Sequence, residues 1–95
     1  MNEMCYTDRE KVYRKAAEIY GVEMQLVVAV EELSEVTKEL CKQARGMGDP
    51  LALAEEVADA AIMLEQVQMI FGIGDEVSAF MDNKVMRLKD SLGRK

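Results

Sequence analysis

A cluster of acidic residues occurs twice in this sequence, and its spacing is the feature best suited to chemistry. The segment VEELSEV is followed twenty-four residues later by the related segment AEEVADA. Each copy places two carboxylates three residues apart, Glu32 with Glu35 and Glu56 with Asp59. Residues three apart on a helix lie within about 60° of each other around the axis. Each copy therefore predicts a pair of carboxylates on one side of a helix.

Two helices joined by a short connection must position these pairs. Apolar residues recur at helical spacing over residues 22–45 and again over residues 50–71. A Gly-Met-Gly connection separates the two segments, and Asp49-Pro50 is a typical helix start. Aspartate caps free N–H groups, and proline suits the first helical position. Because the connection is short, we expect an antiparallel hairpin.

The hairpin should bring the two acidic pairs together. Glu35 is expected to lie roughly level with Glu56, and Glu32 nearer Asp59, within about one helical turn (~5 Å). Each pair borders an apolar stripe that we expect to face the interior. The predicted interior positions are Leu26, Ala29, Val30, Leu33, Val36, Thr37 and Leu40, and then Leu53, Val57, Ala60, Ala61, Leu64 and Val67.

One helix is predicted on each side of the hairpin. Thr7 and Glu10 form a capping box that opens a helix ending near Tyr20, and Asp75 can cap a helix that ends near Leu92. No segment shows the two-residue alternation of a strand. The predicted fold class is therefore all-α, an antiparallel four-helix bundle-like subunit.

Length and composition agree with a small helical domain. The chain has 95 residues, of which 49% are hydrophobic and only 5% aromatic. We assign residues 1–95 to a single domain with its core at 22–92. Ile62, Met63 and Ile70 are apolar positions beyond the main stripe of their helix. Because a chain this short often buries more apolar surface by self-association, we expect a homo-oligomer.

The charge and the residue types exclude several classes of function. The net charge of -6 argues against binding a nucleic-acid backbone or an anionic membrane surface. No apolar run approaches the length of about 20 residues that spans a bilayer. The absence of histidine excludes the usual zinc sites, Ser-His triads and Glu-x-x-His di-iron sites.

The cysteines and the N-terminal segment favour a cytoplasmic location. The segment MNEMCYTDREK lacks the apolar region of a signal peptide. The two cysteines, Cys5 and Cys41, form no CxxC motif, and free thiols suit a reducing compartment. We expect Cys41 to be buried on the inner side of its helix.

Converging carboxylates predict a cation site. Like charges at close range repel, and partial burial increases the cost, so protons or a cation must offset it. Ligands that offer only oxygen suit a hard ion such as Mg²⁺ or Mn²⁺. Magnesium readily takes phosphate oxygens as further ligands, so an acidic protein could bind a phosphate substrate through the metal. The alternative interpretation is that both segments are ordinary solvated helix surface.

The complete double motif resembles a known family. Glu32-x-x-Glu35, twenty residues, then Glu56-x-x-Asp59 is similar to the ExxE…ExxD signature of the all-α NTP pyrophosphatases, the MazG-like nucleoside triphosphate pyrophosphohydrolases. The resemblance covers about residues 22–92. It implies that the four acids bind Mg²⁺ and that the enzyme converts an NTP or dNTP to the monophosphate and pyrophosphate. It also implies a homodimer or homotetramer with the active site beside or across a subunit interface.

Further residues have expected roles in such a site. The family often carries basic residues on the helix after the second motif, where this chain has Lys84 and Arg87. Spaced three apart, they could hold a triphosphate, or they could be a solvated pair. Lys38 is a weaker candidate, and Glu35 could accept a proton from the attacking water. Two alternatives stay open: a phosphoribosyl-ATP pyrophosphatase-like enzyme and a non-catalytic helical interaction protein.

Overall fold

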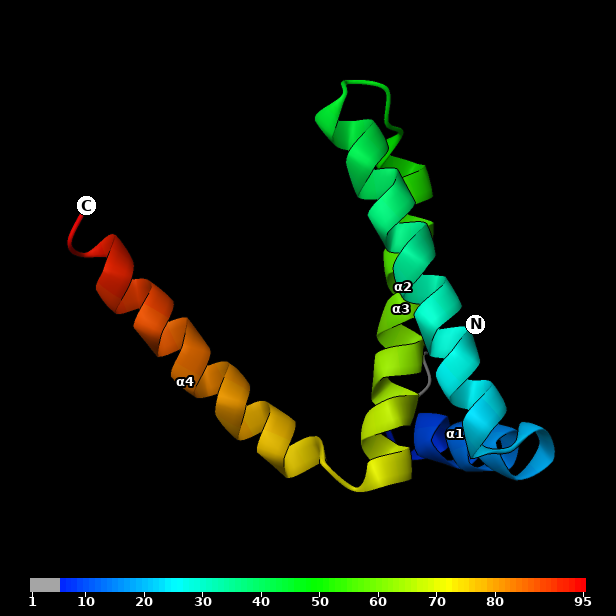
Figure 1. The fold of residues 1–95 in the computed structure, drawn as a ribbon. Helices are drawn as coiled ribbons and strands as arrows, with labels where there is room; N and C mark the ends of the chain where they lie inside the picture. Colours follow the sequence, from blue (N-terminus) through cyan, green and yellow to red (C-terminus); the bar gives the residue numbers. More distant parts are fainter. Residues whose placement is uncertain (1–5) are drawn as a thin grey trace.

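Four α-helices and no strand make up residues 6–95, the part of the chain that the computed structural model describes (Figure 1). Cys5 lies outside these residues. No helix in the described part is long and apolar enough to cross a membrane. The all-α prediction is confirmed. The helices are α1 (Tyr6–Tyr20), α2 (Val22–Ala44), α3 (Pro50–Phe71) and α4 (Gly74–Leu92).

Local sequence explains where the two central helices begin and end. The side chain of Asp49 accepts a hydrogen bond of 3.0 Å from the backbone N–H of Leu51, and Pro50 is the first residue of α3. Gly46 and Gly72 have φ values of 73° and 62°, which glycine adopts at little cost after the last turn of a helix. The predicted bounds of α2 and α3 are confirmed to within one residue.

Two predicted caps are wrong. α1 already includes Tyr6, so Thr7 lies within the helix and is not its N-cap residue. The N-cap of α4 is Ile73, which has no side-chain capping bond, and Asp75 lies in the first turn of that helix. A carboxylate in the first turn is still favourable, because the helix dipole places partial positive charge there.

The helices form a hairpin with one helix across its open end and one that leaves it (Figure 1). α2 and α3 lie antiparallel along their length, as predicted. α1 crosses the end of the hairpin where α2 begins, and it contacts both α2 and α3. α4 contacts only α3 among the described residues, buries none of its own, and extends away from the hairpin. A single chain therefore does not close the expected bundle of four helices.

Two alanines, two glutamines and Met63 are the buried residues of α2 and α3. Ala29 of α2 and Ala60 of α3 are buried, together with the polar Gln25 and Gln66. Alanine lets two helix backbones approach closely. Close packing therefore favours an orientation of each helix in which Ala29 and Ala60 lie in the contact. The prediction for the interior stripes is therefore only partly correct, because several of the larger residues are exposed. The exposed members are Val30, Leu33, Thr37 and Leu40 of α2, and Val57, Ala61 and Leu64 of α3.

The prediction for Cys41 is also wrong, since this residue is exposed. Cys41 follows the buried Ala29 by twelve residues, which turns it about 120° away around α2. The thiol therefore lies on the outside of the hairpin.

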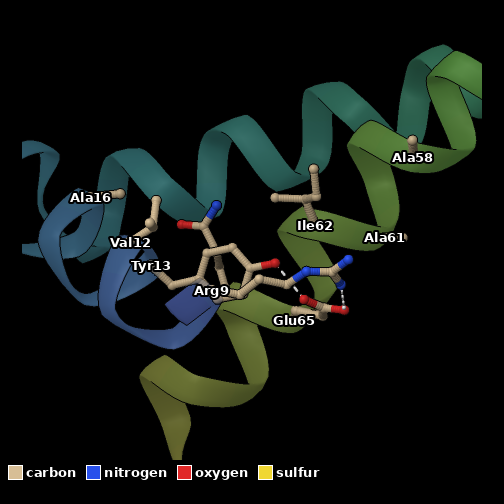
Figure 2. A pocket seen from close by; sticks show the side chains of 9 residues that line it. Arg9, Val12, Tyr13, Ala16, Ala58, Ala61, Ile62 and Glu65 are labelled. Carbon is tan, nitrogen blue, oxygen red and sulfur yellow. Dashed lines mark hydrogen bonds and ion pairs between the residues drawn. The ribbon is translucent and has the colours of Figure 1, made fainter. Parts of the chain in front are cut away.

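A polar contact attaches α1 to α3. Tyr13 is buried, and its hydroxyl donates a hydrogen bond to a carboxylate oxygen of Glu65 (Figure 2). The other carboxylate oxygen of Glu65 lies 3.4 Å from Nη1 of Arg9. Both partners come from α1, so Glu65 holds that helix across the end of the hairpin.

Candidate metal centre

Three of the predicted carboxylates lie together on the central hairpin. Glu32 of α2 and Glu56 and Asp59 of α3 each offer one oxygen, and these three oxygens lie within 4.8 Å of one another. Metal–oxygen distances of about 2.1–2.5 Å allow two ligand oxygens on one ion to be up to ~5 Å apart. The three oxygens are therefore close enough to share a cation.

The packing of α2 against α3 places this triplet. Glu32 follows the buried Ala29 by three residues, and Glu56 precedes the buried Ala60 by four. Residues at these spacings are neighbours on a helix surface, so both carboxylates emerge beside the contact between the helices. Both glutamates are half-buried as a result.

The fourth predicted acid, Glu35, lies at the edge of this triplet. Its side chain is exposed and its oxygens are not among those within 4.8 Å of one another. Its charge still acts on the site. Partial burial raises the pKa of Glu56 above its usual value, and the charge of Glu35 raises it further, followed by those of Asp59, Glu32 and Glu55. The sequence therefore predicted the convergence correctly, but three carboxylates share the centre and the fourth borders it.

The four acids have no basic partner in the part of the chain that the structure describes. Within residues 6–95, no lysine or arginine forms an ion pair with any of the four acids. Ion pairs elsewhere in the described part of the chain join Arg9 to Glu65, Arg14 to Glu10 and Lys42 to Glu39. Repulsion among the clustered carboxylates thus has no compensation from the described part of the chain, which makes a cation favourable there.

The predicted phosphate-binding residues are not gathered at the acids. Lys38 is exposed on α2, one turn beyond Glu35. Lys84 and Arg87 are exposed on α4, which leaves the hairpin from the far end of α3 (Figure 1). Within one chain the structure does not bring this basic pair to the carboxylates.

An open pocket of about 470 Å³ lies elsewhere, between α1 and α3 (Figure 2). The sequence did not predict this pocket, because it forms only where α1 crosses α3. Its walls are mostly apolar, and at one end Arg9 and Tyr13 each donate a hydrogen bond to Glu65. None of the four predicted acids lines it. Because its charged groups already satisfy each other, it suits a polyanionic substrate less well than the carboxylate centre does.

Comparison of the chain with protein-family models, with curated proteins and with solved structures found no match. The chemistry of the site itself therefore indicates what the protein could do. An oxygen-only, uncompensated cluster on two rigid helices could hold a hard divalent cation. Such an ion would leave positions open for water and for phosphate oxygens.

Proposed function

We propose that this protein is a Mg²⁺-dependent nucleotide pyrophosphohydrolase that converts an NTP or dNTP to the monophosphate and pyrophosphate. The observation that carries the proposal is the meeting of Glu32, Glu56 and Asp59 across two helices, with Glu35 beside them and no basic partner in residues 6–95. The MazG-like spacing of the four acids supports the same activity. Mn²⁺ could replace Mg²⁺, because both prefer oxygen ligands.

Each acid has a role in this proposal. Glu32, Glu56 and Asp59 hold the ion, which when bound neutralises phosphate charge and lowers the pKa of a water. Glu35 is exposed at the edge of the triplet, so it is available to accept the proton of the attacking water. The water attacks a phosphorus, the bond to the leaving phosphate oxygen breaks, and pyrophosphate and monophosphate separate.

The proposal includes a cytoplasmic homodimer or homotetramer. Lys84 and Arg87 are assigned to the triphosphate, with Lys38 as a further candidate. Since α4 extends away from the carboxylates of its own chain, the basic pair would need either a movement of α4 or an arrangement of subunits that brings it to them.

A panel of substrates tests the activity. The eight common NTPs and dNTPs and phosphoribosyl-ATP are incubated with the protein and Mg²⁺, and release of pyrophosphate is measured. We expect release from at least one nucleoside triphosphate, and loss of release when a chelator removes the metal. Release from phosphoribosyl-ATP alone would assign the other pyrophosphatase activity. No release from any substrate, with correctly folded protein, would leave a helical interaction protein as the better interpretation.

A further inference from the structure

Another pocket lies where α1, α2 and α3 meet. Its volume is about 450 Å³, and none of the side chains that line it is charged. Tyr20 of α1, Met24 and Val28 of α2, and Met63 of α3 are among them. Ligand pockets of proteins typically enclose about 300–1,000 Å³ and have mostly apolar walls. The pocket therefore has the size and the walls for a small uncharged ring system.

This pocket lies beside the acidic centre, one helical turn along the central hairpin. Val28 precedes Glu32 by four residues on α2, and Met63 follows Asp59 by four residues on α3. Residues four apart lie on the same side of a helix, about 6 Å from each other along its axis. Because the two helices are antiparallel (Figure 1), a step back along α2 and a step forward along α3 lead in the same direction. The pocket and the three carboxylates therefore share one side of the hairpin.

Two buried glutamines give this pocket hydrogen-bonding groups. Gln25 and Gln66 line it and are only 5% and 7% exposed. Within residues 6–95, the side chain of Gln25 makes no hydrogen bond, and Oε1 of Gln66 has no partner. The amide nitrogen of Gln66 lies 3.4 Å from the sulfur of Met63, which is a weak acceptor. Buried polar groups are normally paired, so these two amides have unused capacity to bind a ligand.

We infer that this pocket holds the heterocyclic base of the nucleoside triphosphate, and that Gln25 and Gln66 bind the edge of that base. The inference rests on the proposed function, since the carboxylate centre would hold the phosphates of the same molecule. The ribose then spans the single helical turn between the pocket and the centre. A glutamine amide can donate to one atom of a base and accept from its neighbour, as it does with adenine. The amide turns easily about its last side-chain bond, so both glutamines can meet a base edge.

The other lining residues also suit a base. A nucleobase is uncharged near pH 7, and no charged side chain lines the pocket. Tyr20 and Met24 are 64% and 52% exposed there, so a base would cover them and could stack on the tyrosine ring. The pocket between α1 and α3 offers less, because Arg9 and Tyr13 already donate to Glu65 there.

Nucleosides without phosphate test the base site independently of metal and catalysis. The nucleosides of the five common bases are titrated into the full chain without divalent metal, and chemical-shift changes are followed by NMR. We expect at least one nucleoside to bind with a dissociation constant in the millimolar range. In the wild type, we expect nuclear Overhauser effects between protons of the base and the methyl groups of Met24 and Met63. This readout locates the base without any variant.

Removal of each amide tests the assigned residues. Gln25→Met and Gln66→Met keep the length of the side chain, and we expect each to weaken nucleoside binding by about tenfold, the order of one two-point contact between an amide and a base. The melting temperature of the free protein should not fall, because an apolar group replaces a buried amide that has no partner. Gln43→Met is the matched control, since Gln43 lies on the same helix eighteen residues after Gln25 and beside Gly48. We expect it to bind nucleosides like the wild type.

Three results would overturn the inference. No nucleoside binds to the folded wild type, or the bound base contacts Val12 and Ile62 of the pocket between α1 and α3 instead of Met24 and Met63, or both glutamine variants bind as tightly as the wild type. Where a glutamine variant does not fold, the contacts of the base in the wild type decide.

The same measurements separate the base site from the proposed activity. A nucleoside bound at Met24 and Met63, in a protein that releases no pyrophosphate from any triphosphate, keeps the base site and rejects the activity. Release of pyrophosphate together with any of the three contrary results keeps the activity and rejects the base site.

Discussion

The carboxylates of the candidate centre differ in how far they are exposed to solvent: Glu32 and Glu56 are half-buried, whereas Glu35 is exposed. Glu56 is half-buried and its pKa is raised, first by burial and then by the charges of Glu35, Asp59, Glu32 and Glu55. The single chain therefore contains a site that is unfavourable when empty and charged. A bound cation would remove this repulsion and raise the free energy of unfolding. Without a cation, we expect the clustered acids to lower the stability of the fold.

Substitution of single acids should separate activity from stability. If Glu56 is a ligand, Glu56→Gln keeps the shape of the side chain but removes a charge that the ion needs. We expect pyrophosphohydrolase activity to fall by roughly a hundredfold or more, the order found when a key electrostatic contact to a transition state is removed. We expect the same loss for Glu35→Gln, as proton acceptor. The metal-free protein should be no less stable in urea denaturation, because one repulsive charge is gone.

The neighbouring glutamates provide matched controls for this experiment. Glu31 and Glu55 are exposed and stand one position away from Glu32 and Glu56. We expect Glu31→Gln and Glu55→Gln to change activity much less. Equal effects from all four substitutions would mean that the acidic segments are solvated helix surface, and the proposed centre would be wrong.

The raised pKa of Glu56 predicts a pH dependence of stability. In the pH range between the usual value of 4.5 and the raised value, the folded protein binds a proton at Glu56 that the unfolded chain does not. The contribution of Glu56 to the free energy of unfolding should therefore be greatest below the unfolded pKa and be lost as pH rises through the folded pKa. Urea denaturation at a series of pH values gives the free energy of unfolding of the wild type and of Glu56→Gln. The difference between the two proteins at each pH measures the contribution of Glu56. If the free energies of unfolding of the two proteins change with pH in parallel, the prediction is contradicted.

At the scale of elements, one carboxylate of α3, that of Glu65, makes two polar contacts with α1. The buried hydroxyl of Tyr13 donates to Glu65, while the ion pair of Glu65 with Arg9 is half exposed. A hydrogen bond to a charged acceptor stabilises more than an exposed ion pair does, because water screens the latter. The hydroxyl of Tyr13 is therefore expected to contribute more than the guanidinium.

Substitutions in α1 measure this difference. We expect Tyr13→Phe to lower the free energy of unfolding by about 1–2 kcal/mol, since Glu65 keeps partial access to water. Arg9→Ala should cost less than about 1 kcal/mol. Tyr20→Phe is the control, because Tyr20 is exposed and makes no described hydrogen bond, and a change within about 0.5 kcal/mol is expected. If Arg9→Ala lowers the free energy of unfolding more than Tyr13→Phe does, the guanidinium of Arg9 contributes more than the hydroxyl of Tyr13, and the prediction is wrong.

At the scale of the whole molecule, the acidic centre links metal binding to folding. The triplet exists only when α2 and α3 are packed together, so an ion that binds it favours the folded chain. Binding to the folded state alone adds about 2.7 kcal/mol when the ion is at a hundredfold excess over its dissociation constant. We therefore expect the melting temperature to rise in 10 mM Mg²⁺ or Mn²⁺.

Two controls make the melting experiment specific. The same concentration of Na₂SO₄ reports on ionic strength alone, and Asp59→Asn removes one carboxylate of the triplet without removing the helices. We expect Na₂SO₄ not to raise the melting temperature of the wild type as Mg²⁺ does. We also expect Mg²⁺ not to raise the melting temperature of Asp59→Asn to the same extent. An unchanged melting temperature of the wild type in Mg²⁺, with or without a non-hydrolysable nucleotide, would count against a metal centre.

Local patterns in the sequence determined the helices and the acidic pairs. Helical periodicity, the Asp49-Pro50 start and the glycines after each central helix depend on neighbours in the chain, so four helices and a tight α2–α3 hairpin could be predicted from them. The three-residue spacing of each acidic pair then placed both carboxylates of a pair on one side of a helix. Convergence of the pairs followed from the short connection.

Only the tertiary structure decided how each helix is rotated and where α4 lies. The apolar stripes of α2 and α3 are wider than one helix–helix contact, so the side of each stripe that carries Ala29 and Ala60 is buried and several of the larger predicted interior residues are not. The packing leaves Cys41 and several large apolar residues exposed, and it brings the oxygens of Glu32, Glu56 and Asp59 within 4.8 Å of one another. Periodicity cannot choose among adjoining apolar positions, because the choice depends on how all the side chains of two helices fit together.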